Sequence, residues 1–425
     1  MSKYDAIVIG AGHNGLCNAA YLAKSGLKVL VLEKNDYIGG AAVSRELEEG
    51  WLYSNCSYVC SLLRPEIYRD LNLQKHGLQV IAYGGSVTFT KKGDIFGGYS
   101  DHDLSRREIG RYSKKDADAY VRFSRDISKQ CRFIKPLLMR TPPDPTSFKP
   151  KDLNELIWLF KRLYGLGEET IYETIRFYTM SVAEYLEEYF ENDVVKAALS
   201  GSGIIGTGLG PYSPGTAYVL LHHYMGEVDG SIGSWGFARG GMGSVSNALA
   251  GAFQEHDGEI MTNAEVKQIL VKNGRSVGVV LENGDELYAK NIVSNLDVKR
   301  TYLKLFEHGD LDEKIINQVE NFKIRGSSGK LNIALDGLPE FPAMGKNNPL
   351  MHADMHFIDS LERIERAFDD WKNGRWSADP YCDTLIPTLT DPTMAPPGKH
   401  YMSVFVQYAP PKLATGEWTD KDREG

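Results

Sequence analysis

The sequence predicts an α/β protein that opens on a dinucleotide-binding unit, leaves it for a helix-rich excursion and returns to it through a β-meander. Three observations predict this organisation: an apolar N-terminal run that breaks on three glycines, helical spacing over residues 114–199, and alternating strands with two Asn-Gly pairs over residues 264–293. The chain has 425 residues. Because a single core stops growing below that size, we expect at least two domains.

The opening unit has the pattern strand, helix, strand. Residues 5–9 and 28–32 are apolar runs of the length and composition of buried parallel strands. Between them, residues 13–25 carry apolar side chains at helical spacing, and Gly26 is placed to end that helix. The sequence therefore predicts a βαβ unit.

The turn between the first strand and the helix has the spacing of a phosphate-binding loop. Gly10, Gly12 and Gly15 match G-x-G-x-x-G. In such a loop the first glycine permits the tight turn, the second lets backbone approach a pyrophosphate, and the third lets the helix pack closely on the strand. The helix start also offers free N–H groups to phosphate oxygens. Ala11 and Asn14, which lie within the loop, are included among the candidate cofactor-binding residues.

An acid and a second pair of glycines follow the second strand. Glu33 lies about 20 residues beyond the loop, where a carboxylate accepts hydrogen bonds from a ribose diol and repels a 2′-phosphate. Lys34 comes next, and Gly39 and Gly40 then provide bare backbone that can pass against the same dinucleotide, with Ala41 after them. We predict that these residues bind the cofactor.

This combination resembles the FAD-binding entry of the glutathione-reductase-type flavoproteins and, within them, the branch of phytoene desaturases and amine oxidases. In amine oxidases an arginine usually follows the glycine pair, whereas this chain has Ala41, which favours the desaturase side. Motifs along nearly the whole chain are similar to those of the phytoene desaturase-like FAD-dependent oxidoreductases: GAGHNGL, IGGAAV, SLLRPEIYRDL, PGTAYVLLHH, RGGMGSVS, VSNLD and DPTMAPPGKHYMSVFVQYAP. The resemblance implies FAD as cofactor and a discontinuous Rossmann-type FAD domain with an inserted α+β substrate domain.

Residues 264–293 predict the return to the FAD domain. Asn273-Gly274 and Asn283-Gly284 are strong hairpin signals, and they divide three or four strands that precede a buried strand over residues 291–294. The resemblance implies that this meander completes the FAD domain and that the backbone of Val266 lies against the adenine.

The expected domains alternate along the chain. They are the first part of the FAD domain, the substrate domain with its helical lid, the second part of the FAD domain with the meander, and the second part of the substrate domain, over residues 1–75, 76–235, 236–305 and 306–425. The sequence ends without the strand, glycine-rich turn and helix that close the FAD domain in this branch. We therefore expect a truncated version of a longer protein.

Two other glycine-rich segments invite a functional interpretation. Gly201, Gly203 and Gly206 also spell G-x-G-x-x-G, but the residues before them are helical in composition and prolines follow, which favours a flexible loop near the substrate cavity over a nicotinamide site. The segment RGGMGSVSNAL, residues 239–249, predicts a glycine turn that opens onto a helix. Its N–H groups either face flavin or substrate, or belong to the framework.

Histidines are the weak candidates for catalysis. His222 and His223 lie in an apolar stretch, where either could exchange a proton near neutral pH or be a structural histidine held by hydrogen bonds. His352 and His356 are four residues apart, but Ala353 stands where a metalloprotease motif needs glutamate. The sequence therefore predicts no metal site, and it shows no Ser/His/Asp or paired-carboxylate pattern.

Composition limits the partners. A net charge of -8, with acids and bases mixed along the chain, argues against a nucleic-acid partner. The longest apolar runs are strand-length, whereas a bilayer span needs about 20 residues, so we expect no transmembrane segment and leave peripheral membrane contact open. Five scattered cysteines and an N-terminus that enters a strand at once favour a cytoplasmic protein. The oligomeric state is left open.

These features lead to one functional prediction and two alternatives. We expect an FAD-dependent oxidoreductase that transfers hydride to flavin from a hydrophobic substrate, which by resemblance is isoprenoid- or polyene-like. Hydride removal from an apolar C–H bond needs position more than proton transfer, which suits a chain without an evident acid–base set. The alternatives are a flavin amine oxidase and a non-catalytic binding or regulatory protein that keeps the fold. Aromatic side chains of the helix-rich segment suit an apolar substrate or an ordinary core: Trp158, Phe160, Tyr164, Tyr172, Phe177 and Tyr178.

Overall fold

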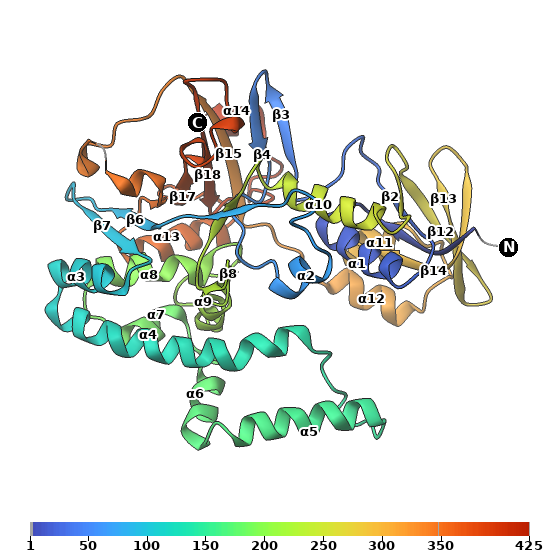
Figure 1. The fold of residues 1–425 in the computed structure, drawn as a ribbon, viewed down its shortest axis with the longest axis horizontal. Helices are drawn as coiled ribbons and strands as arrows, with labels where there is room; N and C mark the ends of the chain where they lie inside the picture. Colours follow the sequence, from blue (N-terminus) through green and yellow to red (C-terminus); the bar gives the residue numbers. More distant parts are fainter. Residues whose placement is uncertain (1–2, 347, 425) are drawn as a thin grey trace.

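Two six-stranded sheets dominate the structure, a computed structural model that describes residues 3–346 and 348–424. The sheet that contains the N-terminal strand lies at one end of the molecule and the second sheet at the other, with a helical layer below the second sheet (Figure 1). The fold is mixed α/β with a Rossmann-like first sheet, which confirms the predicted class.

The first sheet joins the two ends of a long excursion of the chain. Its strand order is β11-β2-β1-β14-β13-β12, with β1, β2, β11 and β14 parallel to their neighbours in that group. The strands are β1 (Tyr4–Ile9), β2 (Val29–Leu32), β11 (Glu259–Met261), β12 (Val266–Lys272), β13 (Arg275–Leu281) and β14 (Glu286–Ser294). Helices α1 (His13–Lys24) and α10 (Gly243–Gln254) pack on each other and bury alanines and leucines against β1 and β2.

The βαβ prediction is confirmed to within one residue at the strand and helix ends. Gly26 has a φ of +89° and its N–H donates to the carbonyl of Ala23, so it ends α1 as predicted. The meander has three strands and a tight turn at Asn273 and Gly274, whose φ values are 53° and 69°. The separate buried strand predicted over residues 291–294 is the second half of β14, because one strand pairs first with β13 and then with β1.

The second sheet has the order β15-β18-β17-β16-β6-β7. Its strands are β6 (Gly85–Phe89), β7 (Ile95–Tyr99), β15 (Ser328–Leu335), β16 (Asp354–His356), β17 (Tyr381–Leu385) and β18 (His400–Gln407). Helices α3 (His102–Tyr112), α4 (Lys114–Ile134), α7 (Val182–Glu187), α8 (Asp193–Ile204) and α9 (Thr216–Tyr224) form the layer beneath it, and α13 (Leu361–Lys372) packs on α8.

Short elements connect the two sheets. A hairpin of β3 (Ser44–Glu48) and β4 (Trp51–Ser54) follows the second glycine pair, and β5 (Val80–Ala82) pairs with β10 (Gly236–Ala238). Other elements of the described chain are α2 (Pro65–Asp70), β8 (Glu227–Val228), β9 (Ser231–Ile232), α11 (Val298–Lys304), α12 (Glu313–Asn321) and α14 (Asp420–Glu424).

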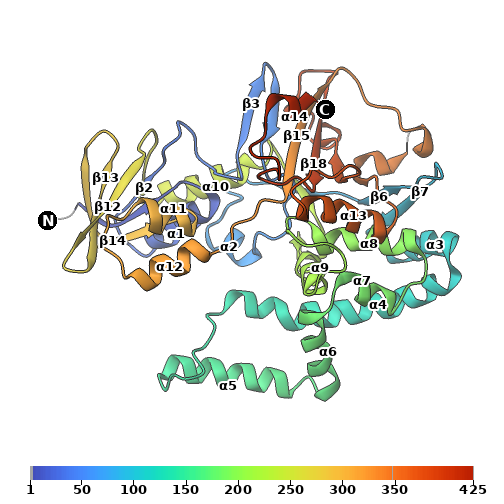
Figure 2. The ribbon, with the colours of Figure 1, turned by 180° about the vertical axis from the view of Figure 1, so that it is seen from behind.

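The helices α5 (Pro150–Tyr164) and α6 (Glu168–Thr179) project away from both sheets in the two views (Figure 1, Figure 2). Of the aromatic residues singled out in this segment, Phe177 is buried in the helical core, whereas Phe160 and Tyr164 are 66% and 80% exposed. These exposed rings therefore form neither a core nor a cavity wall. Within the described part of the chain, no helix combines the length and apolar character needed to cross a bilayer.

Candidate functional site

The glycine loop is closed to side chains. Gly10 has a φ of +96°, a conformation that favours glycine. A Cβ at Gly15 would lie 2.3 Å from the carbonyl oxygen of Gly10, so only glycine lets α1 approach β1 this closely. Gly12 is the N-cap of α1, and no side chain caps the helix there. The start of α1 therefore presents bare backbone, as a pyrophosphate site requires.

The second glycine pair lies directly against this loop. The Gly39 N–H donates to the carbonyl of Ala11 at 2.8 Å, and Gly12 and Gly39 form an isolated parallel bridge. Gly40 has a φ of +58°, and a Cβ there would lie 3.1 Å from the Cα of Gly12. Gly40 and Ala41 are exposed beside the loop. Two short segments of the first 41 residues thus form one strip of backbone.

The acid at the end of β2 faces the same loop. One oxygen of the Glu33 carboxylate accepts from the Ala11 N–H at 2.9 Å, and the other accepts from the backbone and side-chain N–H groups of Asn35 at 3.0 and 2.8 Å. The carbonyl of Glu33 accepts from the Ala264 N–H at 2.8 Å, which brings the start of β12 at Val266 to this edge. The side chains of Lys34 and Asn14 are exposed.

Asn295 is a residue of this site that the sequence interpretation missed. It follows β14 directly, and its N–H donates to the carbonyl of Ile9 at 2.9 Å. Its side-chain amide nitrogen lies 2.9 Å and 3.0 Å from the positions that Cβ atoms would take at Gly12 and Gly15. The available signal was a polar residue just after a buried strand that is parallel to β1.

Bare backbone at five glycines, an inward-facing carboxylate and an amide suit the ADP half of a dinucleotide. A Cβ at Gly12 or Gly15 would fill space in this cradle, and Glu33 keeps a carboxylate at its rim. The residues present therefore fit the FAD that the sequence predicted.

The RGGMGSVSNAL segment belongs to the framework. The N–H groups of Gly240, Met242 and Gly243 donate to Asp391, Ser54 and Ser44 at 2.6, 3.0 and 2.9 Å. Protein acceptors therefore occupy the N–H groups that a flavin or substrate would have used, which decides between the two interpretations of this segment.

The other glycine-rich motif does not form a dinucleotide loop. Gly201 and Gly203 lie inside α8, and Cβ atoms there would lie 2.3 Å from the Tyr381 hydroxyl and 2.8 Å from the Val182 side chain. The flexible loop predicted for this segment is wrong, because these glycines serve close packing of a helix. Gly206, just beyond the helix, has a φ of +72°.

The two candidate histidines sit on α9, and only one has a clear role. The Nδ1 of His223 donates to the carbonyls of Ser202 and Val219 at 2.6 and 2.9 Å, and its ring stacks on Trp235. Burial lowers the pKa of His223 and of His222. His223 is therefore held as a neutral structural histidine, and neither ring lines the polar cavity described next.

A cavity of about 420 Å³ lies between the second sheet and the helical layer. Its lining mixes aromatic and apolar groups with many hydroxyls, and it includes residues from β6, β7, α3, α4, α8, β16 and β17. At the sheet, the cavity is lined by Asp354, His356, Tyr381 and Asp383. Position and lining make it the candidate substrate site.

Strand register assembles this acidic wall. His356 on β16 lies opposite Asp383 on β17, and Asp383 lies opposite Phe405 on β18. Phe405 in turn lies opposite Lys330 on β15, and His356 lies beside Thr88 on β6. Residues in register share a sheet face. One row of side chains therefore crosses five strands from Lys330 to Thr88.

The acids contact each other and their neighbours closely. One atom each from Asp354, His356 and Asp383 lie within 4.8 Å of one another. The His356 Nε2 lies 3.1 Å from an oxygen of Asp354, and the Tyr58 hydroxyl donates to Asp383 at 2.5 Å. The sequence shows no paired-carboxylate pattern, yet the structure brings these two carboxylates together. The two acids are 29 positions apart, so no local motif marks them.

Burial controls the charges in this wall. It raises the pKa of Asp354 to about 6 and raises the pKa of Asp383, on which the Asp354 charge acts in the same direction. Burial lowers the pKa of His356, and it lowers the pKa of Lys330 to about 8. All four shifts favour the neutral form of the group.

Tyr58 connects the acidic wall to the glycine strip. The Ser57 N–H donates to the carbonyl of Ala41 at 3.1 Å, and the next residue is Tyr58, whose hydroxyl donates to Asp383. The Tyr58 ring stacks on Phe405, and the Lys330 ammonium lies 4.8 Å from its centre. One short segment therefore spans the distance between the predicted cofactor site and the cavity.

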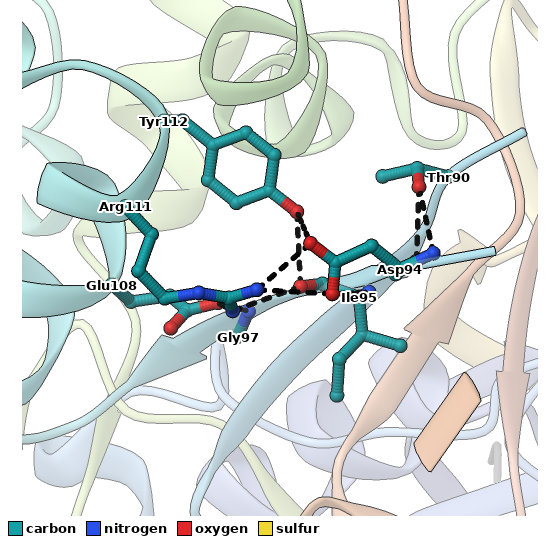
Figure 3. A network of polar contacts seen from close by, with 7 residues as sticks. All are labelled: Thr90, Asp94, Ile95, Gly97, Glu108, Arg111 and Tyr112. Carbon is teal, nitrogen blue, oxygen red and sulfur yellow. Dashed lines mark hydrogen bonds and ion pairs between the residues drawn. The ribbon is translucent and has the colours of Figure 1, made fainter. Parts of the chain in front are cut away.

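A polar network holds the far edge of the cavity, where β7 meets α3 (Figure 3). Arg111 on α3 donates to both carboxylate oxygens of Asp94 at 3.0 and 2.8 Å and to Glu108 at 2.5 Å. The Gly97 N–H donates to Glu108 at 3.2 Å, and the Tyr112 hydroxyl donates to Asp94 at 3.2 Å. These contacts fix the β6–β7 hairpin against the helix that lines the cavity.

Comparisons with known proteins relate this chain to flavin-containing oxidoreductases. A family model described as flavin-containing amine oxidoreductase matches residues 158–422, and one described as NAD(P)-binding Rossmann-like domain matches residues 8–71. The pyridine nucleotide-disulfide oxidoreductase domain-containing protein 2 of Mus musculus is 34% identical over 99% of this chain and 76% of its own length.

Two proteins named for prolycopene and for limonene are also similar. The chloroplastic prolycopene isomerase of Daucus carota is 29% identical over 95% of this chain and 61% of its own length. A limonene dehydrogenase chain from Castellaniella defragrans is 26% identical over 99% of this chain and 76% of its own length. Among solved structures, a putrescine oxidase variant has the same fold, with a TM-score of 0.56 at 13% identity over 95% of this chain and 75% of that one.

Proposed function

Because the chain belongs to the flavin-containing amine oxidoreductase family, and is an FAD-dependent oxidoreductase, we propose that it takes a hydride from an apolar, isoprenoid- or polyene-like substrate. The observation that carries this proposal is the continuous strip of glycine backbone with Glu33 at its edge, connected through Tyr58 to the 420 Å³ cavity. Bound FAD would supply the hydride acceptor.

The proposal assigns the cofactor contacts to residues of this strip. The start of α1 and the second glycine pair bind the pyrophosphate, Glu33 accepts from the ribose, and the start of β12 lies against the adenine. These residues are Gly10, Ala11, Gly12, Asn14, Gly15, Glu33, Lys34, Gly39, Gly40, Ala41 and Val266, with Asn295 added. The division into FAD and substrate parts at residues 75, 235 and 305 is part of the same proposal.

The substrate class is supported by relatives named for limonene and prolycopene. Peripheral contact with a membrane that carries such a substrate belongs to the proposal, and it is supported by an exposed apolar stripe along α5. The stripe consists of Leu153, Ile157, Phe160 and Tyr164. A cytoplasmic location is supported by five free cysteines.

Amine oxidation is the second candidate, and one observation favours it. The cavity places two carboxylates beside aromatic rings, including Tyr381 and Tyr83, and such a setting can hold an ammonium group. Against it stands Ala41, at the position where amine oxidases usually have arginine.

Anaerobic reduction of the purified protein tests both candidates. We expect flavin absorption near ~450 nm, and we expect it to bleach when limonene is supplied in phosphatidylcholine vesicles but not when putrescine is added. Bleaching by putrescine alone would replace the leading proposal with amine oxidation. Bound flavin that neither compound reduces would favour a non-catalytic role. Protein that stays in the supernatant after the vesicles are sedimented would contradict the membrane contact.

A further inference from the structure

The Asp354–Asp383 pair in the wall of the second sheet is not among the residues proposed to bind the cofactor. Both carboxylates line the cavity, and Asp383 is only 2% exposed. One oxygen of each carboxylate is buried without a hydrogen-bond partner, and so is the hydroxyl of Tyr381, which is 1% exposed. Buried polar atoms are normally paired, so these three atoms indicate a missing proton or ligand at the cavity wall.

Two ionised carboxylates in this position would repel each other away from water. A single shared proton removes one charge and supplies the missing hydrogen bond, as in other close carboxylate pairs. The Tyr58 hydroxyl already donates to one oxygen of Asp383, and it can stabilise the remaining negative charge.

We propose that Asp354 and Asp383 share one proton and act as the acid–base pair of this cavity, accepting the proton that a bound substrate must release as its hydride leaves. This inference rests on the proposed function and adds its proton acceptor. The substrate would lose a hydride, with the electron pair of its C–H bond, to the oxidant flavin. The neighbouring C–H or N–H bond would break, its electron pair would form the new C=C or C=N bond, and its proton would pass to the carboxylate pair.

The side chains around the pair suit this role. The titratable groups whose charges interact with the pair are Tyr58, Tyr83, Lys330, His356, Tyr381 and, from the opposite sheet face, Cys382. Burial favours the neutral form of each of them, so these groups supply little opposite charge to stabilise a doubly ionised pair. Tyr58, which donates to Asp383, directly follows Ser57, and the Ser57 N–H donates to Ala41 on the proposed flavin side.

Infrared spectroscopy tests the shared proton without any substrate. At pH 7 we expect a carboxylic-acid C=O band in the wild type that shifts in D₂O and disappears in Asp354→Asn and in Asp383→Asn. Asp116→Asn is the matched control, because Asp116 is also buried but accepts from the N–H groups of Glu191 and Asn192 at 3.0 Å each. A wild-type spectrum without this band, or a stoichiometric metal ion in the purified protein, would overturn the proposal.

Stability adds a second measurement to the same variants. The pKa of the pair is higher in the folded protein than in the unfolded one. The stability that its protons contribute is therefore fully present at pH values below the unfolded pKa, and it is lost as the pH rises through the folded pKa. We therefore expect Asp383→Asn to melt above the wild type at pH 8, with the difference shrinking towards pH 4, and Asp116→Asn to melt below it at both. A pH-independent difference for Asp383→Asn would count against the shared proton.

The flavin itself reports whether the pair serves the reaction. When the flavin midpoint potential of the FAD-loaded wild type is plotted against pH, the slope should change at the pH where the pair titrates. This change of slope should be absent in Asp354→Asn. The same slope in both proteins would separate the pair from the redox site and overturn its acid–base role. A protein that shows the carboxylic-acid band but holds no flavin would instead contradict the proposed function alone.

Discussion

The glycine strip and the acidic wall are assembled in opposite ways. The strip is built mainly from residues 10–41, and its geometry depends on backbone that carries no side chains. The wall takes one or two side chains from each of several strands, and residues as distant as Lys330 and Thr88 meet only through strand register. The residues of the strip are therefore close together in the sequence, whereas the residues of the wall come together only when the second sheet forms.

Electrostatics separates the two regions as well. The strip offers N–H groups and a helix start, which attract negative charge. The wall buries two acids among neutral or easily neutralised groups, and every shift there favours the uncharged form. The proposed site for an anionic cofactor thus lies one segment away from a site suited to proton exchange, and Tyr58 lies between them.

The largest expected effect tests the strip alone. In Gly15→Ala the new Cβ would lie 2.3 Å from the Gly10 carbonyl oxygen, which forces α1 away from β1. Overpacking of this kind costs about 1–3 kcal/mol, so FAD affinity should fall by roughly 10- to 100-fold in a fluorescence titration. Gly84→Ala is the control, because a Cβ there meets nothing within 4 Å.

Gly12→Ala keeps this test informative if Gly15→Ala fails to fold. Its Cβ would approach the movable Asn295 amide closely, at 2.9 Å, with the Gly40 Cα at an ordinary 4.0 Å, so the fold should persist while the cofactor loses its bare backbone. Unchanged FAD affinity in both variants would show that the cofactor lies elsewhere.

The backbone geometry of the strip could be predicted from the sequence because each sequence signal for it spans only a few residues. Glycine spacing, a strand-ending acid and Asn-Gly turns all act within a few residues, and the fold class, the βαβ unit and the meander followed from them. Asn295 escaped notice because its place depends on β14 lying beside β1, a pairing of residues 285 positions apart. His222 and His223 drew attention as a local pair, although the proton chemistry is concentrated in acids from different strands.

A smaller effect is expected at Asn295, a residue that only the tertiary fold brings to the strip. Asn295→Asp keeps the shape of the side chain but places a negative charge beside Gly12 and Gly15, where the pyrophosphate would lie. Repulsion between charges near a protein surface amounts to about 4 kcal/mol at 4 Å before screening, so a loss of at least about tenfold in FAD affinity is expected at low salt.

Salt separates this charge effect from a change of shape. Added salt should recover part of the affinity of Asn295→Asp, because it screens exposed charges. Asn295→Ala, which removes the amide without adding charge, should lose less affinity and show no such recovery. An Asn295→Asp variant that binds FAD as well as the wild type would remove Asn295 from the site.

The smallest effect concerns the connection between the two regions. Tyr58→Phe removes the hydroxyl that donates to Asp383 and keeps the ring that stacks on Phe405. The free energy of unfolding should fall by about 1 kcal/mol, the usual net value of such a bond. Because this hydrogen bond holds the pKa of Asp383 down against burial, its loss should raise that pKa further, and the carboxylic-acid band should persist to higher pH. FAD affinity should stay unchanged, since the strip does not use the hydroxyl. If Tyr58→Phe also lost FAD affinity, the strip and the wall would form one cooperative site. The distinction between a local strip and a tertiary wall would then not hold at Tyr58.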